Sequence, residues 1–449
     1  MIKNIDSLVN NQYRKTISDY LKWEEKRRAT HTIVIGHNNP LPDGDCICST
    51  HAFARAINLM VNDMKYPTTL NLSTIEIQYA AKRNPYIDKV LDYIDTIIEN
   101  TNSDSEMNLY DIVRSFDEKE EANTNFEKRI REALVEKKKK GLAVFVLDTD
   151  YLRTGYEDTL ERLGDIVKDC GLEFEDVFFG IIDHHSPKDG YDVMPKGFRS
   201  DTEGLNSFKL ILPSNMKIGG ASSTCEIIMN ILSTYSDTYK DMNAFKSLDS
   251  EKYLLYVKDY MSTMGKILMG GIRTDTGNFV FNGHESAIRA ICEFVYVYNL
   301  DNTEYLQVDQ ELIQSITEPK KSVKNIDVYA YFMKNIVATD DGFAYMVVNV
   351  KNISEMGIKP IHTLQEFEWK SAVAITANEV DRTLKLEIRS TDPKFNCRKL
   401  AQAIHPSGGG HLQAAGVTVQ CDEGTSLSDA SNKLVQQFID YMREIEKYK

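Results

Sequence analysis

The stretch VFFGIIDHH, residues 177–185, carries much of the information about the fold class of this 449-residue chain. Its first six residues are apolar apart from one glycine and rich in aromatic and β-branched side chains, which indicates a buried strand. The run ends abruptly in Asp183, His184 and His185. Continuous apolar strands of this kind are typical of parallel sheets that are covered on both faces.

Two other runs have the same form. TIVI at residues 32–35 is followed by GHNNPLPDGD, and LAVFVL at residues 142–147 is followed by DTD. Each run comes after helical or polar sequence, and this alternation predicts an α/β fold with a mostly parallel sheet. Because ligands bind beyond the carboxyl ends of such strands, the charged residues after the three runs mark the expected functional site.

Four segments would bring acidic and imidazole side chains to this edge of the sheet. Besides the three strand ends, the turn-rich segment GGIRTDTG at residues 270–277 contributes a carboxylate. A lone aspartate at a strand end is usually a cap or a turn residue, but four such segments together favour a functional site. The candidate residues are His37, Asp43, Asp45, Asp148, Asp183, His184, His185 and Asp275.

Charge indicates what such a site would bind. Carboxylates within about 4–6 Å of one another raise each other's pKa, because like charges disfavour ionisation. Two divalent cations would balance four carboxylates, and oxygen and imidazole ligands without sulfur favour Mn²⁺, with Mg²⁺, iron or Co²⁺ as substitutes. Two metal ions suit phosphoester hydrolysis, since they acidify a water molecule and neutralise charge on the phosphoryl group.

These residues resemble the motifs of the DHH family of phosphoesterases. The DHH sequence at 183–185 matches the motif that names the family. Further resemblance lies in PDGD at 42–45, LDT at 147–149 and TDTG at 274–277. In this family the motifs surround a pair of metal ions, so the resemblance implies ligand roles for individual residues.

The resemblance implies two sets of metal ligands. One ion would be held by His37 and Asp43, with Asp148 as the bridging ligand. The ligands of the other ion would be Asp45, His184 and Asp275.

Two further residues of the motifs would act on the substrate or on its neighbours. His185 would face the scissile phosphate as an electrophile or as a proton donor to the leaving oxygen. Asp183 would either orient a neighbouring histidine or ligate a metal ion. Asp150 is an alternative to Asp148, although Asp148 directly ends its strand.

The first motif is longer than in the family. His37 lies six residues before Asp43, where the family usually has four, and Leu41-Pro42 is the extra pair. In strict register Asn39 would take the ligand position. We favour His37, because a bulge in the loop costs less than a missing ligand.

The C-terminal part resembles the DHHA1 substrate-binding domain. Arg389 and Ser390 are followed by SGGGH at 407–411 and AAG at 414–416, in the order of that domain's glycine-rich motif. The glycines would expose backbone N–H groups to a substrate phosphate, and the cationic side chains would add charge-assisted contacts; a tight turn with an exposed cation is the alternative. The implied substrate-binding residues are Arg389, Ser390, Gly408, Gly409, Gly410 and His411.

A small-residue segment, ASSTCE at residues 221–226, is typical of the start of a helix. Its N–H groups would either receive a phosphate or form a plain helix cap.

The motifs divide the chain into two domains. Residues 1–310 are predicted to form a DHH catalytic domain with a parallel sheet and a polar insertion at about 96–140. Residues 326–449 are predicted to form a smaller α/β DHHA1 substrate-binding domain. Helical sequence at 301–325 would link the two.

The composition of the chain limits the kinds of binding partner that we expect. The chain has 53 basic and 67 acidic side chains, a net charge of −14. A protein that coats nucleic acid would be basic, so nucleic-acid contact should be local and the substrate short. No apolar run approaches the roughly 18–20 residues of a membrane span, and residues 1–26 lack the apolar stretch of a signal peptide.

Cysteine usage indicates the compartment. Seven cysteines without a CxxC pair argue against both a disulfide framework and a thiolate zinc site, so we expect a reducing cytoplasm. Cys46 and Cys48 lie in a run of small residues and are interpreted as packing residues.

The resemblance also suggests substrate classes. Proteins with this domain plan resemble nanoRNases, phosphatases of adenosine 3′,5′-bisphosphate and hydrolases of dinucleotides. We therefore expect a metal-dependent phosphoesterase that hydrolyses short oligonucleotides, dinucleotides or nucleotide bisphosphates. The alternatives are a cyclic-dinucleotide phosphodiesterase, a single-strand-specific exonuclease and a nucleotide-binding sensor without catalysis. For the oligomeric state, the sequence leaves both a monomer and a homodimer open.

Overall fold

The computed structural model divides the chain into two compact units, Met1–Pro319 and Lys320–Lys449. The division lies within residues 301–325. The structure describes residues 2–27, 29–38, 41–64, 73–102, 112–187, 193–198, 206–213, 216, 219–241, 250–279, 284–300, 310–317, 326–339, 342–350, 360–365, 367–392, 394–410 and 412–447.

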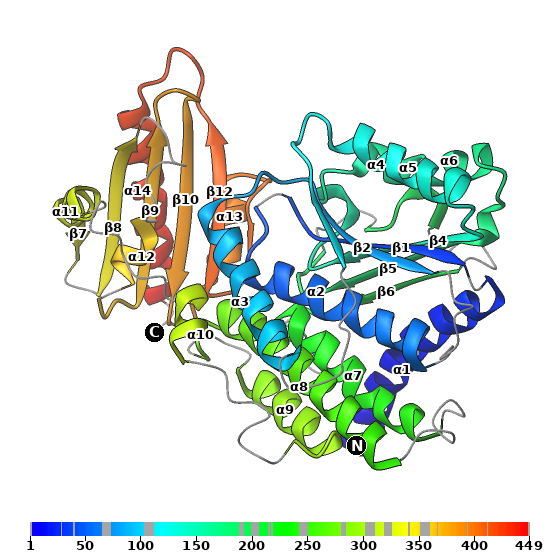
Figure 1. The fold of residues 1–449 in the computed structure, drawn as a ribbon. Helices are drawn as coiled ribbons and strands as arrows, with labels where there is room; N and C mark the ends of the chain where they lie inside the picture. Colours follow the sequence, from blue (N-terminus) through cyan, green and yellow to red (C-terminus); the bar gives the residue numbers. More distant parts are fainter. Residues whose placement is uncertain are drawn as a thin grey trace. The chain divides into compact units, whose positions relative to one another are not determined.

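The first unit is built on a six-stranded parallel sheet (Figure 1). Its order is β3-β2-β1-β4-β5-β6. The strands are β1 (Thr30–Ile35), β2 (Thr74–Tyr79), β3 (Val113–Phe116), β4 (Gly141–Leu147), β5 (Val177–Asp183) and β6 (Ser207–Ile211). Every residue of β1, β4 and β5 is buried, as their continuous apolar sequences predict. The predicted α/β fold with a parallel sheet is confirmed.

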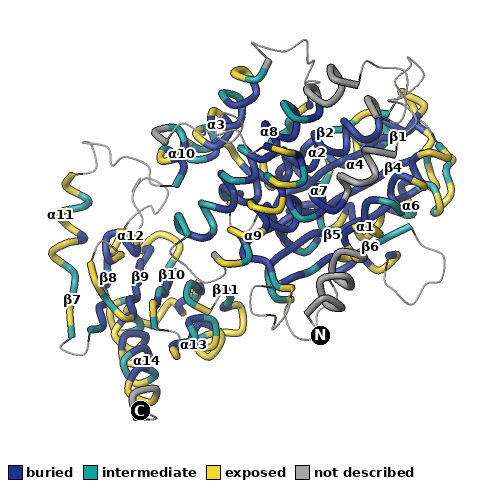
Figure 2. The backbone as a smooth tube through the Cα atoms, turned by 90° about the horizontal axis from the view of Figure 1, so that it is seen from below, coloured by how far each residue is buried: buried dark blue, intermediate teal, exposed yellow. Residues whose placement is uncertain are grey.

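Helices cover both faces of this sheet, because side chains of a strand point alternately to opposite faces. Phe145 and Phe178 belong to one core, and their neighbours Val144 and Phe179 belong to the other. The first core is covered by α1 (Ile2–Arg27), α2 (Gly44–Asn58), α3 (Pro85–Asn102), α7 (Thr224–Asp241), α8 (Ser250–Asp275) and α9 (His284–Val297). The second core is covered by α4 (Ala122–Arg131), α5 (Glu157–Glu161) and α6 (Leu163–Asp169). Figure 2 shows the deeply buried stretch formed by α2 and the central strands.

Short helical turns complete the first unit. They are η1 (Leu59–Met64), η2 (Glu132–Glu136), η3 (Tyr151–Arg153), η4 (Phe174–Asp176) and η5 (Lys196–Phe198).

The strand order reverses between β1 and β4. From β1 the chain runs outward through β2 to β3, and it then returns to the other side of β1 as β4. Connections that leave two neighbouring strands in opposite directions open a crevice at the carboxyl ends of those strands. His37 lies just after β1 and Asp148 directly after β4, so the topology brings both to this reversal in strand order.

The segment at about 96–140, predicted to be a polar insertion, is integral to the sheet. It contains β3, which extends the sheet beyond β2, and α4, which buries Phe126 and Ile130 in the second core. Residues 103–111 lie outside the described part of the chain.

The helical sequence predicted as a linker is partly packed into the first unit. Helix α10 (Gln310–Thr317) buries Ile313 and Ile316 in the core that also contains α2. Residues 301–309 and 318–325 are not among those described.

The second unit contains a mixed six-stranded sheet of order β11-β12-β10-β9-β8-β7. Strands β8 and β9 are parallel and the other neighbours are antiparallel. The strands are β7 (Ile336–Ala338), β8 (Phe343–Val350), β9 (Ser371–Asn378), β10 (Thr383–Ser390), β11 (Gly409–Gly410) and β12 (Ala414–Gln420). One core contains α13 (Cys397–Ile404) and α14 (Leu427–Lys447), and the other contains α11 (Ile326–Lys334) and α12 (Pro360–Leu364).

Gly180 in β5 tests the packing of the central sheet. A Cβ at this position would lie 2.7 Å from the ring of Phe208 and 2.8 Å from that of Phe145. We expect Gly180→Ala to lower the free energy of unfolding by about 1–3 kcal/mol, measured by urea unfolding, because the core is already filled. Gly424→Ala is the matched control, since its Cβ would meet no atom within 4 Å. Equal unfolding midpoints for the two variants would contradict the packing.

Candidate metal centre

The first motif is positioned by the start of α2. Asp43 is the N-cap residue of α2, and its Oδ1 accepts a hydrogen bond from the N–H of Cys46 at 3.0 Å. Gly44 allows this helix end to approach α8, because a Cβ there would lie 2.5 Å from the side chain of Thr274. The close approach brings the first motif to Asp275 at the end of α8.

Asp45 is fully buried against the start of α7. Its two carboxylate oxygens accept hydrogen bonds from the backbone N–H groups of Thr224 at 2.6 Å and Cys225 at 2.9 Å. The positive end of a helix stabilises such a carboxylate. These N–H groups are therefore occupied by Asp45 rather than exposed to a phosphate, and Ser223 Oγ caps α7 by accepting from the N–H of Glu226 at 3.1 Å.

Asp148 follows β4 in the left-handed region, with φ of 63°. Aspartate and asparagine tolerate this conformation better than most residues, and a non-glycine residue held in it often has a functional role. Its N–H donates to the carbonyl oxygen of Ile182 at 2.9 Å, and its Oδ1 accepts from the hydroxyl of Thr224 at 3.0 Å. Sequence reasoning missed this role of Thr224, although its small-residue segment was recognised.

One imidazole lies beside each carboxylate oxygen of Asp148, His184 beside Oδ1 and His37 beside Oδ2. His184 Nε2 is 3.2 Å from Asp148 Oδ1 and 3.1 Å from Asp275 Oδ2, and it is 3.7 Å from Asp45 Oδ2. His37 Nε2 is 3.5 Å from Asp148 Oδ2. Asp148 is thus shared by two groups of side chains.

His37 reaches this cluster in spite of the longer first motif. The residue is 3% exposed, and its Nε2 lies 3.8 Å from Asp43 Oδ1. Asn39, the alternative in strict register, lies outside the described residues. Asp150, the alternative to Asp148, caps η3 by accepting from the N–H of Leu152 at 3.0 Å.

Asp183 holds His185. One oxygen, Asp183 Oδ1, lies 2.8 Å from His185 Nδ1 and accepts the His185 N–H at 2.9 Å. Burial opposes protonation of His185, but the Asp183 carboxylate outweighs it and raises the imidazole pKa to about 9. This contact orients the His185 ring, and His185 Nδ1 is also 3.7 Å from Asp148 Oδ1.

Ionising all the carboxylates of the cluster at once is unfavourable, because they are buried and close to one another. Burial, together with the charges of Asp148 and Asp43, raises the pKa of Asp45 well above its usual range. Burial and the neighbouring carboxylates raise the pKa of Asp275 in the same way. Burial also acts on Asp148, but the imidazoles of His184 and His37 outweigh it and hold that pKa well below its usual range.

The donor set fits divalent metal ions. Asp148 Oδ2 and Asp275 Oδ2 are buried and accept no hydrogen bond. Buried carboxylate oxygens without donors are costly unless a cation compensates them. The described residues contain three groups whose ligand atoms lie within 4.8 Å of one another: Asp45, His184 and Asp275; Asp148, His184 and His185; and His37, Cys46 and Asp148.

The glycines of the C-terminal motif have different roles. Gly408 does not expose its N–H as predicted, because that group donates to the carbonyl oxygen of His405 at 2.8 Å. A Cβ on Gly408 would also lie 2.2 Å from Ala401 O, and Gly410 has a φ of 127° that favours glycine. Only at Gly409, among the three, would a Cβ meet no atom within 4 Å. His411 lies outside the described residues.

Arg389 and Ser390 end strand β10. The hydroxyl of Ser390 donates to the carbonyl oxygen of Lys370 at 2.9 Å and lies 2.7 Å from Ser371 Oγ, so it joins neighbouring strand ends inside the unit. Arg389 Nη1 donates to the carbonyl oxygen of Ile388 at 3.0 Å.

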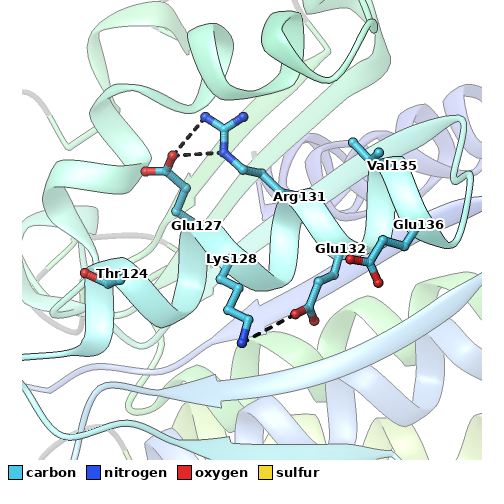
Figure 3. Close-up of a pocket in the computed structure, with 7 residues that line it drawn as sticks. All are labelled: Thr124, Glu127, Lys128, Arg131, Glu132, Val135 and Glu136. Atoms are coloured by element: carbon cyan, nitrogen blue, oxygen red, sulfur yellow. Dashed lines mark hydrogen bonds and ion pairs between the residues drawn. The ribbon is translucent and has the colours of Figure 1, made fainter.

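The first unit has a surface hollow on α4 and η2 (Figure 3). Its lining is mostly charged and forms ion pairs within the helix, such as Arg131 with Glu127 at 2.9 Å. The hollow is lined by Thr124, Glu127, Lys128, Arg131, Glu132, Val135 and Glu136. None of the predicted site residues belongs to it.

Comparison with known proteins identifies the fold. No protein-family model matches the chain, and no curated protein matches it. An exopolyphosphatase-related protein from Bacteroides fragilis is similar over 96% of both chains, with 17% identity and a TM-score of 0.54. The chain therefore shares the two-unit α/β fold of that protein.

Two further solved structures are more distant. A putative family II inorganic pyrophosphatase from Methanococcus jannaschii is 14% identical over 82% of this chain and 90% of its own, with a TM-score of 0.33. RecJ from Thermus thermophilus, in complex with Mn²⁺, is 12% identical over 97% of this chain and 54% of its own, with a TM-score of 0.38. Among the described helices, none has the length and apolar character needed to cross a membrane.

Mn²⁺ should stabilise the folded chain through Asp148. At a free Mn²⁺ concentration 100 times the Kd, binding adds about 2.7 kcal/mol to the free energy of unfolding. We expect Asp148→Asn to lose most of this gain in thermal unfolding with and without Mn²⁺, since asparagine keeps the left-handed conformation but removes the charge. Asp169→Asn, whose exposed carboxylate pairs with Arg131 at 3.2 Å, is the control. An equal gain in both variants would place Mn²⁺ elsewhere.

Proposed function

We propose that the chain is a metal-dependent phosphoesterase of the DHH type. The observation that supports this most is the position of Asp148, buried in a left-handed turn between the imidazoles of His37 and His184. An arrangement of this kind suits a carboxylate that bridges two cations. The fold shared with an exopolyphosphatase-related protein agrees with phosphoryl transfer to water, the reaction class to which phosphoester hydrolysis also belongs.

The ligands proposed for two divalent ions follow the two groups around Asp148. His37 and Asp43 would hold one ion and Asp45, His184 and Asp275 the other, with Asp148 between them. Mn²⁺ suits this set best, and Mg²⁺ or Co²⁺ would substitute. When bound, the ions would supply an activated water molecule and positive charge beside the phosphoryl oxygens.

His185 would act on the substrate from beside this centre. Asp183 fixes the ring through its contact with Nδ1, and His185 would face the scissile phosphate in this orientation. The Asp183 carboxylate favours the protonated form of the ring, because it outweighs the burial that opposes protonation. The ring would stabilise negative charge or donate a proton to the leaving oxygen, and Asp183 would hold it in place.

The substrate class we propose is short and linear: dinucleotides, short oligonucleotides or nucleotide bisphosphates. A net charge of −14 disfavours long polyanions. The second unit would bind substrate through Gly409, Arg389 and, by its resemblance to the DHHA1 motif, His411. We place the protein in the cytoplasm, because all seven cysteines are free thiols.

A substrate panel with Mn²⁺ tests the function. The panel contains pApA, adenosine 3′,5′-bisphosphate, cyclic dinucleotides, oligonucleotides of increasing length and pyrophosphate. We expect the shortest linear nucleotides to be hydrolysed fastest, and His185→Gln to lower kcat by about 10²–10⁴-fold because a proton donor is lost. His362→Gln, on an exposed position of α12, is the control.

Three results would contradict this assignment. Tight binding of a nucleotide without turnover would indicate a sensor, turnover of pyrophosphate alone would indicate a pyrophosphatase, and unchanged kcat in His185→Gln would remove its proposed role.

Gly409→Ala tests substrate binding by the second unit. Because the new Cβ would meet no atom within 4 Å, the fold should tolerate it, and the unfolding midpoint should stay unchanged. A substrate phosphate lying against this backbone would be displaced, so we expect KM to rise about tenfold, equivalent to 1.4 kcal/mol. Gly424→Ala, with equally open surroundings, should leave KM unchanged. Identical KM values in the two variants would exclude a contact at Gly409.

A further inference from the structure

Cys46 lies at the metal centre although its sequence context indicates a packing role. It is the third residue of α2, directly after Asp45, and it is fully buried. The backbone N–H of His37 donates to its Sγ at 3.3 Å. The sulfur is thus held beside the residue that follows β1.

Gly36 makes room for this sulfur. A Cβ at Gly36 would lie 2.6 Å from Cys46 Sγ, so only glycine allows the thiol to lie against the carboxyl end of β1. The glycine and the N–H of His37 together fix where the sulfur lies.

The sulfur faces two of the proposed ligands. A ring nitrogen of His37, a carboxylate oxygen of Asp148 and Cys46 Sγ all lie within 4.8 Å of one another. Ligand atoms of one ion, at about 2.0–2.3 Å from it, are separated by up to about 4.4 Å, so small movements would close this triangle around a cation. Asp148 is 1% exposed, and its Oδ2, 3.5 Å from His37 Nε2, accepts no hydrogen bond, so a cation in this triangle would compensate its buried charge.

We propose that Cys46 Sγ is a thiolate ligand in the half of the metal centre that contains His37 and Asp148. This inference rests on the proposed function, because it concerns the same centre. The thiol proton leaves to solvent when the metal–sulfur bond forms. The donor set of that half is then oxygen, nitrogen and sulfur, which increases its preference for Co²⁺, Zn²⁺ or Fe²⁺ over Mg²⁺.

Neighbouring thiols provide internal controls. Cys48 is also fully buried in α2, but it belongs to none of the ligand groups found among the described residues. Cys225 Sγ donates to the carbonyl oxygen of Asp45 at 3.6 Å, which gives that sulfur a separate structural role.

Co²⁺ absorption spectroscopy on the 449-residue chain tests the proposal. Co²⁺ bound by oxygen and nitrogen gives only weak visible bands, whereas a thiolate ligand adds an intense charge-transfer band in the near ultraviolet. We expect this band in the wild-type protein and in Cys48→Ala, and its loss in both Cys46→Ala and Cys46→Ser with the visible bands retained. Serine is close to cysteine in size, so Cys46→Ser should fold like the wild-type protein. A loss of the band in this variant would therefore result from the missing sulfur and not from misfolding.

Other outcomes separate the two proposals. Visible cobalt bands without a near-ultraviolet band in the wild-type protein would overturn the thiolate ligand and leave the proposed metal centre intact. A band that persists in Cys46→Ala would assign the sulfur to another cysteine and also overturn the inference. No cobalt spectrum at all would overturn the metal centre of the proposed function and the thiolate ligand together.

Discussion

Mutual repulsion of buried carboxylates is the constraint on which the site depends. Asp45, Asp148 and Asp275 come from three separate parts of the chain. Burial and neighbouring carboxylates raise the pKa of Asp45 and Asp275, whereas the imidazoles of His184 and His37 outweigh burial and lower that of Asp148. The protein compensates part of this cost itself, with the first N–H groups of α7 on Asp45 and the hydroxyl of Thr224 on Asp148. Two buried oxygens still accept no hydrogen bond, and a divalent cation would meet that need.

The fold creates this repulsion by bringing the strand ends together. The strand order reverses between β1 and β4, where His37 and Asp148 meet, and glycines let the helices approach these residues closely. At Gly271 in α8, a Cβ would lie 2.2 Å from Cys225 Sγ and 3.2 Å from Asp45 Oδ1. Small residues at such positions are therefore part of the site, because any side chain would push α8 away from Asp45.

The parallel sheet could be predicted from the sequence, because buried strands have continuous apolar runs. The residues that gather at its edge could be predicted because they follow the ends of these runs. The sequence did not predict β3, a four-residue strand whose sequence VRSF has two polar residues at its centre and no apolar run, so the surrounding segment was predicted only as a polar insertion. The sequence also could not distinguish Gly408 from Gly409, because both are glycines of the same motif. In the structure, the N–H of Gly408 donates to His405, whereas Gly409 has open space around its Cβ position. Contacts between distant elements, such as Thr224 with Asp148, have no local signal at all.

A crystal structure with Mn²⁺, with anomalous scattering measured at the manganese edge, would locate the ions. We predict two peaks, about 3.5–4 Å apart, with an oxygen of Asp148 close to both. A single peak, or peaks remote from Asp148, would show that this carboxylate does not bridge a pair of ions.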